Sequence, residues 1–191
     1  QSPPPVMPFT HMCLDTKDEK DQRYIVMVDR FTGFPFVEKL CKENPAEDLV
    51  KFCRRTFALI SIPEIIESDS GGEFVSNVFQ NYLQEAKINH RTSSPDNPQS
   101  NGRSEAGVKA VLRLLKDNTD EHGISNIPNF QYGLMNLRNT PDPISKLSPA
   151  QIVFGKPMKD HLPYMKEWSK EIDKYWLQIW NYKELTDRRR I

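Results

Sequence analysis

The sequence predicts an α/β fold in which helices cover a mixed β-sheet. Three β-rich runs come first, and the short connections between them favour an antiparallel meander. Segments with helical periodicity then alternate with short apolar runs. Strands first, followed by alternating helices and strands, indicate a mixed sheet with helices packed on it.

Composition is that of an ordinary globular chain. The 191 residues predict one domain with attachments, and 37% of them are hydrophobic and 27% charged. No apolar run approaches the roughly 18 residues that a membrane span needs, so we expect no membrane association. Lys plus Arg and Asp plus Glu both number 26, and a neutral chain is a poor general binder of polyanions. Any contact with nucleic acid must therefore come from local patches.

The first three strands are expected at residues 11–16, 23–30 and 34–40. A charged turn over residues 17–22 separates the first two, and Thr32-Gly33 marks the break before the third. A helix is expected from Pro45, because Pro is favoured at the start of a helix. Its apolar residues recur at helical spacing: Leu49, Phe52, Cys53, Phe57 and Ile60.

The rest of the chain continues the alternation. A strand over 63–69, a helix over 73–86, a strand over 88–93 and a loop over 94–102 are expected in turn. Further helices are predicted over 103–116 and around Phe130–Arg138, the second closed by Thr140-Pro141, and a separate amphipathic helix over 164–185. We interpret the aromatic stripe of the last helix, which includes Trp168 and Trp176, as a packing surface rather than a ligand site. The predicted organisation is a Pro-rich leader or linker (1–8), a core (9–160) and a C-terminal helix with a basic tail (161–191).

Cysteine and histidine carry no recognisable site. Cys13, Cys41 and Cys53 are odd in number and match no disulfide or zinc spacing, so we interpret them as buried free thiols in a reducing compartment. The four histidines are too scattered for a zinc knuckle: His11, His90, His122 and His161.

Three acids stand where an open sheet presents ligands. Asp15 lies on the first strand, Asp69 ends the fourth, and Glu105 opens a helix. Carboxylates brought together repel, and hard divalent cations such as Mg²⁺ remove that conflict. Two such ions can clamp the attacking and leaving oxygens of a phosphoryl displacement. Asp29 also ends a strand, but a turn or cap role is favoured there over a metal ligand.

The surroundings of these acids are distinctive. Asp69 is followed by Ser-Gly-Gly-Glu-Phe, and Glu105, with 35 residues between the two, follows the loop Ser-Pro-Asp-Asn-Pro-Gln-Ser-Asn-Gly. These motifs closely resemble the integrase core of retroviruses and long-terminal-repeat retrotransposons, especially the gypsy-like class. The resemblance extends to YIVMVDRFTGFPFVEKL and to residues 137–158, and spans roughly 9–160.

This resemblance implies a ribonuclease-H-like fold: a five-stranded mixed sheet flanked by helices. It implies that Asp15 with Asp69, and Asp15 with Glu105, hold two Mg²⁺ or Mn²⁺ ions per active site. The implied activity is processing of the 3′ ends of element DNA and transfer of the freed 3′-hydroxyl into target DNA, with no Ser, Cys or His nucleophile. Element ends and target DNA would be the partners, and the nucleus the site of action after a cytoplasmic stage. We expect a homodimer that assembles further on DNA.

Residues around Glu105 are candidate DNA contacts. Gln99 and Asn101 in the loop can hydrogen-bond bases or phosphates. Arg103, Lys109 and Arg113 supply positive charge, and the last two follow Glu105 at one and two helical turns. The alternative role of these cations is a solvated helix surface.

The chain also departs from the family pattern. Ser70 replaces the usual Asn, and Asp96 replaces an aromatic, which puts the DNA-end contacts of that aromatic in doubt. We expect the family's N-terminal zinc-binding domain and C-terminal DNA-binding barrel to lie outside this sequence. The main alternative is a host-derived, non-catalytic DNA-binding or protein-binding module of the same fold, and a second is another ribonuclease-H-like nuclease.

Overall fold

The computed structural model describes residues 7–92, 102–124, 126–143 and 145–159. Five strands form its main sheet in the order β3-β2-β1-β4-β5. Their bounds are β1 (His11–Glu19), β2 (Gln22–Asp29), β3 (Pro35–Leu40), β4 (Ile65–Ser68) and β5 (Asn89–Thr92). The first three run antiparallel, whereas β4 lies parallel to β1 and β5 lies parallel to β4. The predicted meander and the predicted five-stranded mixed sheet are confirmed.

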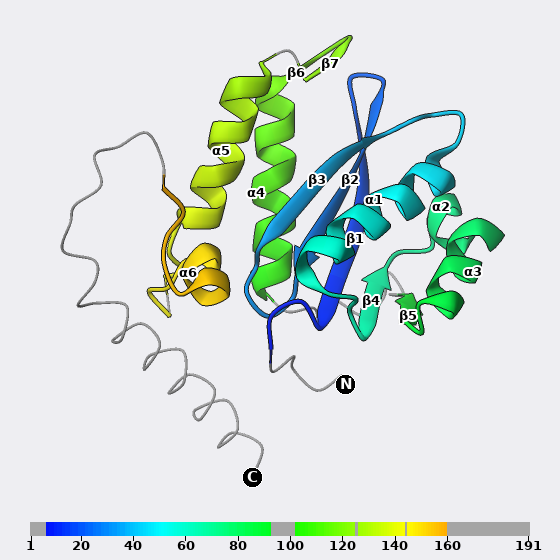
Figure 1. The fold of residues 1–191 in the computed structure, drawn as a ribbon. Coiled ribbons are helices and arrows are strands. Elements are labelled where there is room, and N and C mark those ends of the chain that lie inside the picture. The colour runs from blue at the N-terminus through cyan, green and yellow to red at the C-terminus, as the bar shows by residue number, and fades with distance from the viewer. Residues whose placement is uncertain (1–6, 93–101, 125, 144, 160–191) are drawn as a thin grey trace.

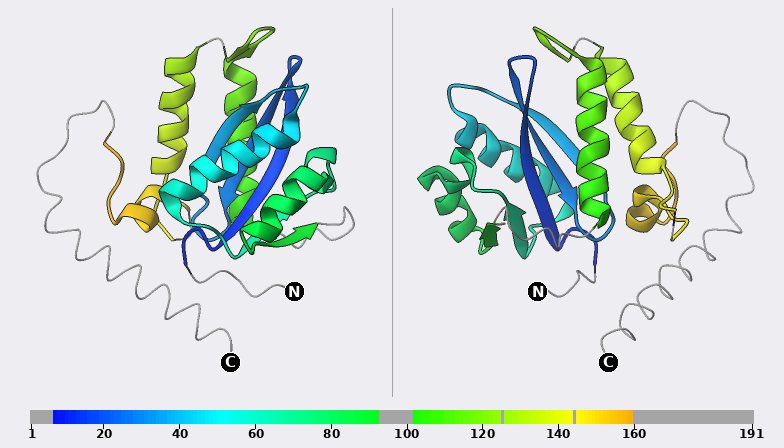
Figure 2. Two further views of the ribbon diagram at one scale, coloured as in Figure 1. Left: turned by 45° about the vertical axis from the view of Figure 1, so that its right-hand side comes forward. Right: turned by 180° about the vertical axis from the view of Figure 1, so that it is seen from behind.

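Helices pack on both faces of this sheet (Figure 1). They are α1 (Pro45–Ile60), α2 (Gly72–Val75), α3 (Asn77–Glu85), α4 (Gly102–Asn118), α5 (Ile127–Asn139) and α6 (Pro149–Phe154). Two short strands, β6 (Thr119–Asp120) and β7 (Gly123–Ile124), pair with each other after α4. Figure 2 shows α1, α2 and α3 on one face and α4 with α5 on the other.

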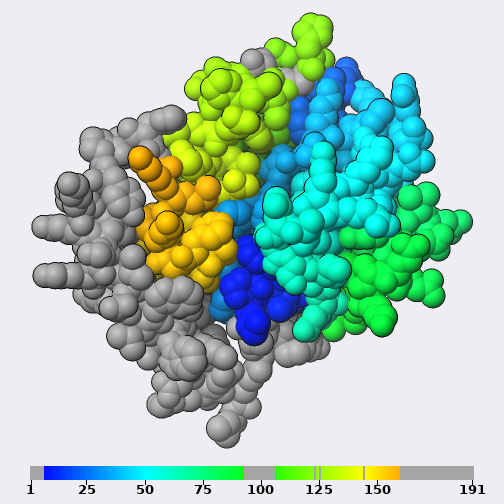
Figure 3. All heavy atoms as spheres, viewed as in Figure 1, coloured from blue at the N-terminus to red at the C-terminus, as the bar shows by residue number. Residues whose placement is uncertain are grey.

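Side-chain alternation along the strands builds a separate core on each face. Met12, Leu14 and Ile25 belong to the core beneath α1 and α3, whereas Val26 and Val28 belong to the core beneath α4 and α5. Figure 3 shows α1 (cyan) and α3 (green) forming one continuous outer surface over the first core. A strand residue between two positions of one core therefore faces the helices on the other side of the sheet. This alternation decides which face carries the site described below.

The connection between β1 and β2 differs from the sequence prediction. The charged turn expected over 17–22 is only two residues long, because β1 runs to Glu19 and β2 begins at Gln22. Lys20 and Asp21 have φ values of 43° and 62°, and positive φ at both positions is the geometry that a two-residue hairpin turn requires.

The helix expected over 73–86 is two helices. Ser76 is extended (φ −63°, ψ 146°), its side chain accepts a hydrogen bond from the backbone N of Phe79, and its hydroxyl donates to the carbonyl of Glu73. This N-cap, worth about 1 kcal/mol in general, starts α3 and separates it from α2.

The structure adds elements that the sequence prediction lacked. β6 and β7 form a short hairpin, and α6 is opened by a capping box of Ser148 and Gln151 and closed by Gly155 in the left-handed region. Ser followed three residues later by Gln, with Gly after the helix, was the available signal for α6. The predicted helix over 164–185 lies outside the described residues. Within the described part of the chain, no helix is long and apolar enough to cross a membrane.

Candidate active site

The sheet brings Asp15 and Asp69 together. β1 and β4 pair in parallel, with Met12 opposite Ile66 and Cys13 opposite Glu67. Continuing this step by two residues sets Asp15 beside Asp69, which directly follows β4. The electrostatics agree, because burial first and the negative charge of Asp69 second raise the pKa of Asp15. A partly buried carboxylate in the middle of β1 and an exposed carboxylate just after β4 therefore lie side by side.

Asp15 opens to the face that α4 covers. Leu14 lies in the core beneath α1, so its neighbour Asp15 faces the other way. Val26, paired with Asp15 across β1 and β2, lies in the core that α4 and α5 cover. The site is therefore on the α4 side of the sheet.

Glu105 occupies the first turn of α4, where the structure describes the backbone. Val108 and Leu112, three and seven residues later on the same helix, both pack against the core on this face. This end of the helix packs closely on the sheet at Gly107. The space there is so tight that an added Cβ would lie 3.1 Å from Cγ1 of Val28 on β2. The start of α4 thus lies over the same face of the sheet that Asp15 occupies.

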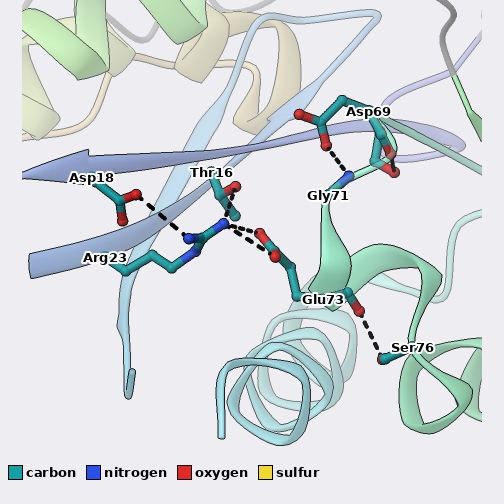
Figure 4. Close-up of polar contacts among 8 residues, drawn as sticks. Thr16, Asp18, Arg23, Asp69, Gly71, Glu73 and Ser76 are labelled. Atoms are coloured by element: carbon teal, nitrogen blue, oxygen red, sulfur yellow. Dashed lines mark hydrogen bonds and ion pairs between the residues drawn. The ribbon is translucent and has the colours of Figure 1, made fainter. Parts of the chain in front are cut away.

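The turn after β4 holds the Asp69 carboxylate by its own backbone. The N–H of Gly71 donates to Oδ1 of Asp69 at 2.9 Å (Figure 4). A Cβ on Gly71 would lie 3.1 Å from that same oxygen, closer than nine in ten real Cβ contacts. Glycine is therefore the residue that lets the N–H approach the carboxylate without steric conflict.

A series of side-chain hydrogen bonds also holds the Asp69 backbone from the α3 side. The Ser68 hydroxyl donates to the Asp69 carbonyl at 2.8 Å and lies 2.9 Å from Nε2 of His90. Nε2 of Gln80 lies 2.9 Å from Nδ1 of His90 and also donates to the carbonyl of Phe74. Since the amide nitrogen can only donate, Nδ1 of His90 accepts and Nε2 carries the proton. Burial lowers the pKa of His90, which favours this neutral form.

The donor set at Asp15 and Asp69 suits a hard cation. It consists of carboxylate oxygens, the ligand type that Mg²⁺ and Mn²⁺ prefer. A cation would also relieve the repulsion that helps raise the pKa of Asp15. Among the described residues no group of three or more His, Cys, Asp or Glu is placed to hold a metal ion. The described geometry therefore supplies a carboxylate pair, and Glu105 is the third candidate ligand.

Three of the five predicted DNA contacts lie on α4. Lys109 and Arg113 are exposed on that helix. Arg103 belongs to its first turn, where the backbone is described, whereas Gln99 and Asn101 lie outside the described residues.

Asp29 has the structural role that the sequence favoured. Its fully buried carboxylate accepts hydrogen bonds from the backbone N–H of Phe9 and from both the N–H and the hydroxyl of Thr32. Burial raises the pKa of Asp29, and these donors oppose the rise. The carboxylate is thus a local cap for the turn after β2.

The cysteine prediction was partly wrong. None of the three cysteines forms a disulfide, but only Cys53 is buried; Cys13 is partly exposed and Cys41 is exposed. Cys41 directly follows β3, and residues 41–44 of this connection are all exposed.

Sequence comparison agrees with the fold. Residues 5–98 match the family described as Integrase core domain. The Pro-Pol polyprotein of simian foamy virus type 1 is 29% identical over 134 residues, which are 69% of this chain and 11% of that polyprotein. The chain therefore spans about a tenth of the length of that relative.

Solved structures share the architecture. The catalytic core domain of BIV integrase is similar with a TM-score of 0.61 at 18% identity, covering 76% of this chain and 93% of that one. The HTLV-2 integrase catalytic core domain, solved in complex with magnesium, has a TM-score of 0.58 at 20% identity, covering 77% and 97% respectively.

The five-stranded mixed sheet flanked by helices is thus a ribonuclease-H-like fold. With the family match and the viral relatives, it shows that this chain carries a retroviral-type integrase catalytic core. The homology supports the polynucleotidyl transferase class of enzyme.

Proposed function

We propose that this chain catalyses metal-dependent processing of DNA 3′ ends and strand transfer of element DNA into target DNA. The observation that carries the proposal is the pairing of Asp15 with Asp69 on the face where α4 begins. The family match supports the same reaction class.

Asp15, Asp69 and Glu105 would hold two Mg²⁺ or Mn²⁺ ions. When bound, such ions stabilise the charge on the attacking and leaving oxygens of an in-line displacement. Asp15 contributes a partly buried carboxylate, whose charge is less screened by water than that of a surface acid. The N–H of Gly71 fixes one oxygen of Asp69 and leaves the other to bind a cation.

The DNA would lie along the start of α4. We assign its phosphate and base contacts to Gln99, Asn101, Arg103, Lys109 and Arg113, of which Lys109 and Arg113 are exposed on the described part of that helix. Integration joins two DNA ends, so we further propose that the active form is a homodimer or larger assembly acting in the nucleus after a cytoplasmic stage.

A cleavage and joining assay on labelled DNA ends, with and without Mg²⁺ or Mn²⁺, tests this function. Asp69→Asn keeps the size of the side chain and removes a charged ligand, so cleavage and joining should fall by orders of magnitude while the thermal melt stays cooperative. Asp21→Asn is the matched control, because Asp21 lies in the exposed β1–β2 turn, and it should retain activity.

Metal-dependent joining that persists in Asp69→Asn would show that the site is wrongly placed. A folded chain that neither cleaves nor joins DNA with either metal would instead favour the non-catalytic binding module.

A further inference from the structure

An ion pair lies behind the carboxylate pair, on the opposite face of the sheet. Nη2 of Arg23 on β2 contacts both carboxylate oxygens of Glu73 on α2, at 2.9 and 3.1 Å (Figure 4). The same nitrogen donates to the Thr16 hydroxyl at 3.3 Å. The Glu73 side chain is 4% exposed and that of Arg23 is 30% exposed. This is a largely buried contact and not a surface ion pair.

These three residues connect the two strands that carry the acids. Thr16 directly follows Asp15 on β1, and Glu73 follows Asp69 by four residues. Successive strand residues face opposite sides, so Asp15 faces α4 while Thr16 faces α2. Thr16, Arg23 and Glu73 are called the strand clamp below, because they join β1 to the segment that follows β4.

The charges hold the strand clamp in its ionised form. Burial opposes ionisation of Glu73, but hydrogen bonds from Thr16 and Arg23 outweigh it and lower the pKa of Glu73. The hydrogen bond to Glu73 raises the pKa of Arg23. Breaking such a pair by removing one partner leaves a buried charge without compensation, which is strongly unfavourable.

We propose that the strand clamp consists of positioning residues that set the separation of Asp15 and Asp69 for metal binding. The proposal rests on the proposed function, because it concerns the same two carboxylates. Neither Arg23 nor Glu73 faces the α4 side of the sheet, so both act through the backbone of the strands they join. Partners that orient metal ligands in this way commonly change metal affinity when mutated.

A Mn²⁺ titration of the 191-residue chain, followed by electron paramagnetic resonance of the free ion, tests the strand clamp without requiring activity. Arg23→Lys keeps the net charge but loses the planar fork that reaches Glu73 and Thr16 together. We expect Mn²⁺ binding to weaken by about 10-fold or more. If only long-range charge mattered, the Arg23→Lys variant would bind Mn²⁺ as tightly as the unmodified chain does.

Lys42→Gln is the matched control. Lys42 lines the same open cavity of about 700 Å³ as Arg23 and Glu73. Its Nζ, however, forms an ion pair with Oδ1 of exposed Asp21 at 4.0 Å. The Lys42→Gln substitution removes a positive charge near the strand clamp and should leave the Mn²⁺ affinity unchanged. Thr16→Val serves as a milder second variant if Arg23→Lys does not fold, and it should weaken Mn²⁺ binding in the same direction.

The outcomes separate the two proposals. Variants that melt at lower temperature yet bind Mn²⁺ as the unmodified chain does would make the strand clamp purely structural and overturn its positioning role alone. If replacing Asp15 left Mn²⁺ binding unchanged, the proposed function would be overturned, and the role of the strand clamp with it.

Discussion

At the scale of single residues, Gly71 shows how a backbone group takes part in the site. Its N–H donates to Oδ1 of Asp69, and the absence of a Cβ permits that approach. Gly71→Ala would place a Cβ 3.1 Å from that oxygen and 3.3 Å from the buried ring of Phe74. We expect the Asp69 carboxylate to shift and joining activity to fall about 10-fold, as misplacement of a catalytic group generally costs one to two orders of magnitude.

Gly72→Ala provides the comparison for Gly71→Ala. A Cβ on Gly72 would have no neighbouring atom within 4 Å, and neither glycine has a positive φ. The two variants therefore differ in the contacts that a Cβ makes with Asp69, Phe74 and Glu73, and not in backbone strain. Equal rates in a joining assay for Gly71→Ala and Gly72→Ala would remove the proposed role of the Gly71 N–H.

Asp15 and Asp29 show that the surroundings of an acid decide its role. Burial raises the pKa of both. Asp29 accepts hydrogen bonds from three donors, one on Phe9 and two on Thr32, whereas Asp15 faces a second carboxylate. Donors that satisfy a buried carboxylate make it a cap, and an adjacent like charge makes it a candidate cation ligand.

At the scale of elements, the sequence predicted most of the sheet. The strand runs and the helix from Pro45 follow simple periodicity, and α1 begins at that residue. The break at Ser76 was missed because the apolar positions of 73–86 keep one helical phase while a side-chain cap interrupts the backbone. Local hydrogen bonding therefore overrode periodicity there.

The candidate site was only partly predictable. Motif spacing pointed to Asp15, Asp69 and Glu105, and the parallel register of β1 and β4 accounts for the proximity of the first two. Arg23 and His90 were not predicted as parts of the site, because their roles depend on the pairing of strands and on the placement of α2 and α3. The available signal for Glu73 was an acid four residues after Asp69 within the same motif.

At the scale of the whole molecule, α5 offers a surface for self-association. Ile127 and Tyr132 on that helix are 57% and 37% exposed, and exposed apolar groups on one helix favour contact with a second copy. We expect light scattering at micromolar concentration to give the mass of a dimer. Ile127→Asp should shift it toward the monomer.

Val78→Asp provides the control for the dimer. Val78 is also exposed, at 46%, but lies on α3 and away from α5. A monomer mass for the unmodified chain would contradict the homodimer, and a dimer unaffected by Ile127→Asp would place the contact elsewhere.

The central claim is that Asp15, Asp69 and Glu105 form one divalent-metal site. Anomalous diffraction from crystals soaked in Mn²⁺ tests it most directly, because the ion is located independently of any activity. We predict one Mn²⁺ bound by oxygen atoms of Asp15 and Asp69, and a second bound by Asp15 and Glu105. Mn²⁺ bound elsewhere, with Asp15 and Asp69 free of the ion at saturating concentration, would contradict the account.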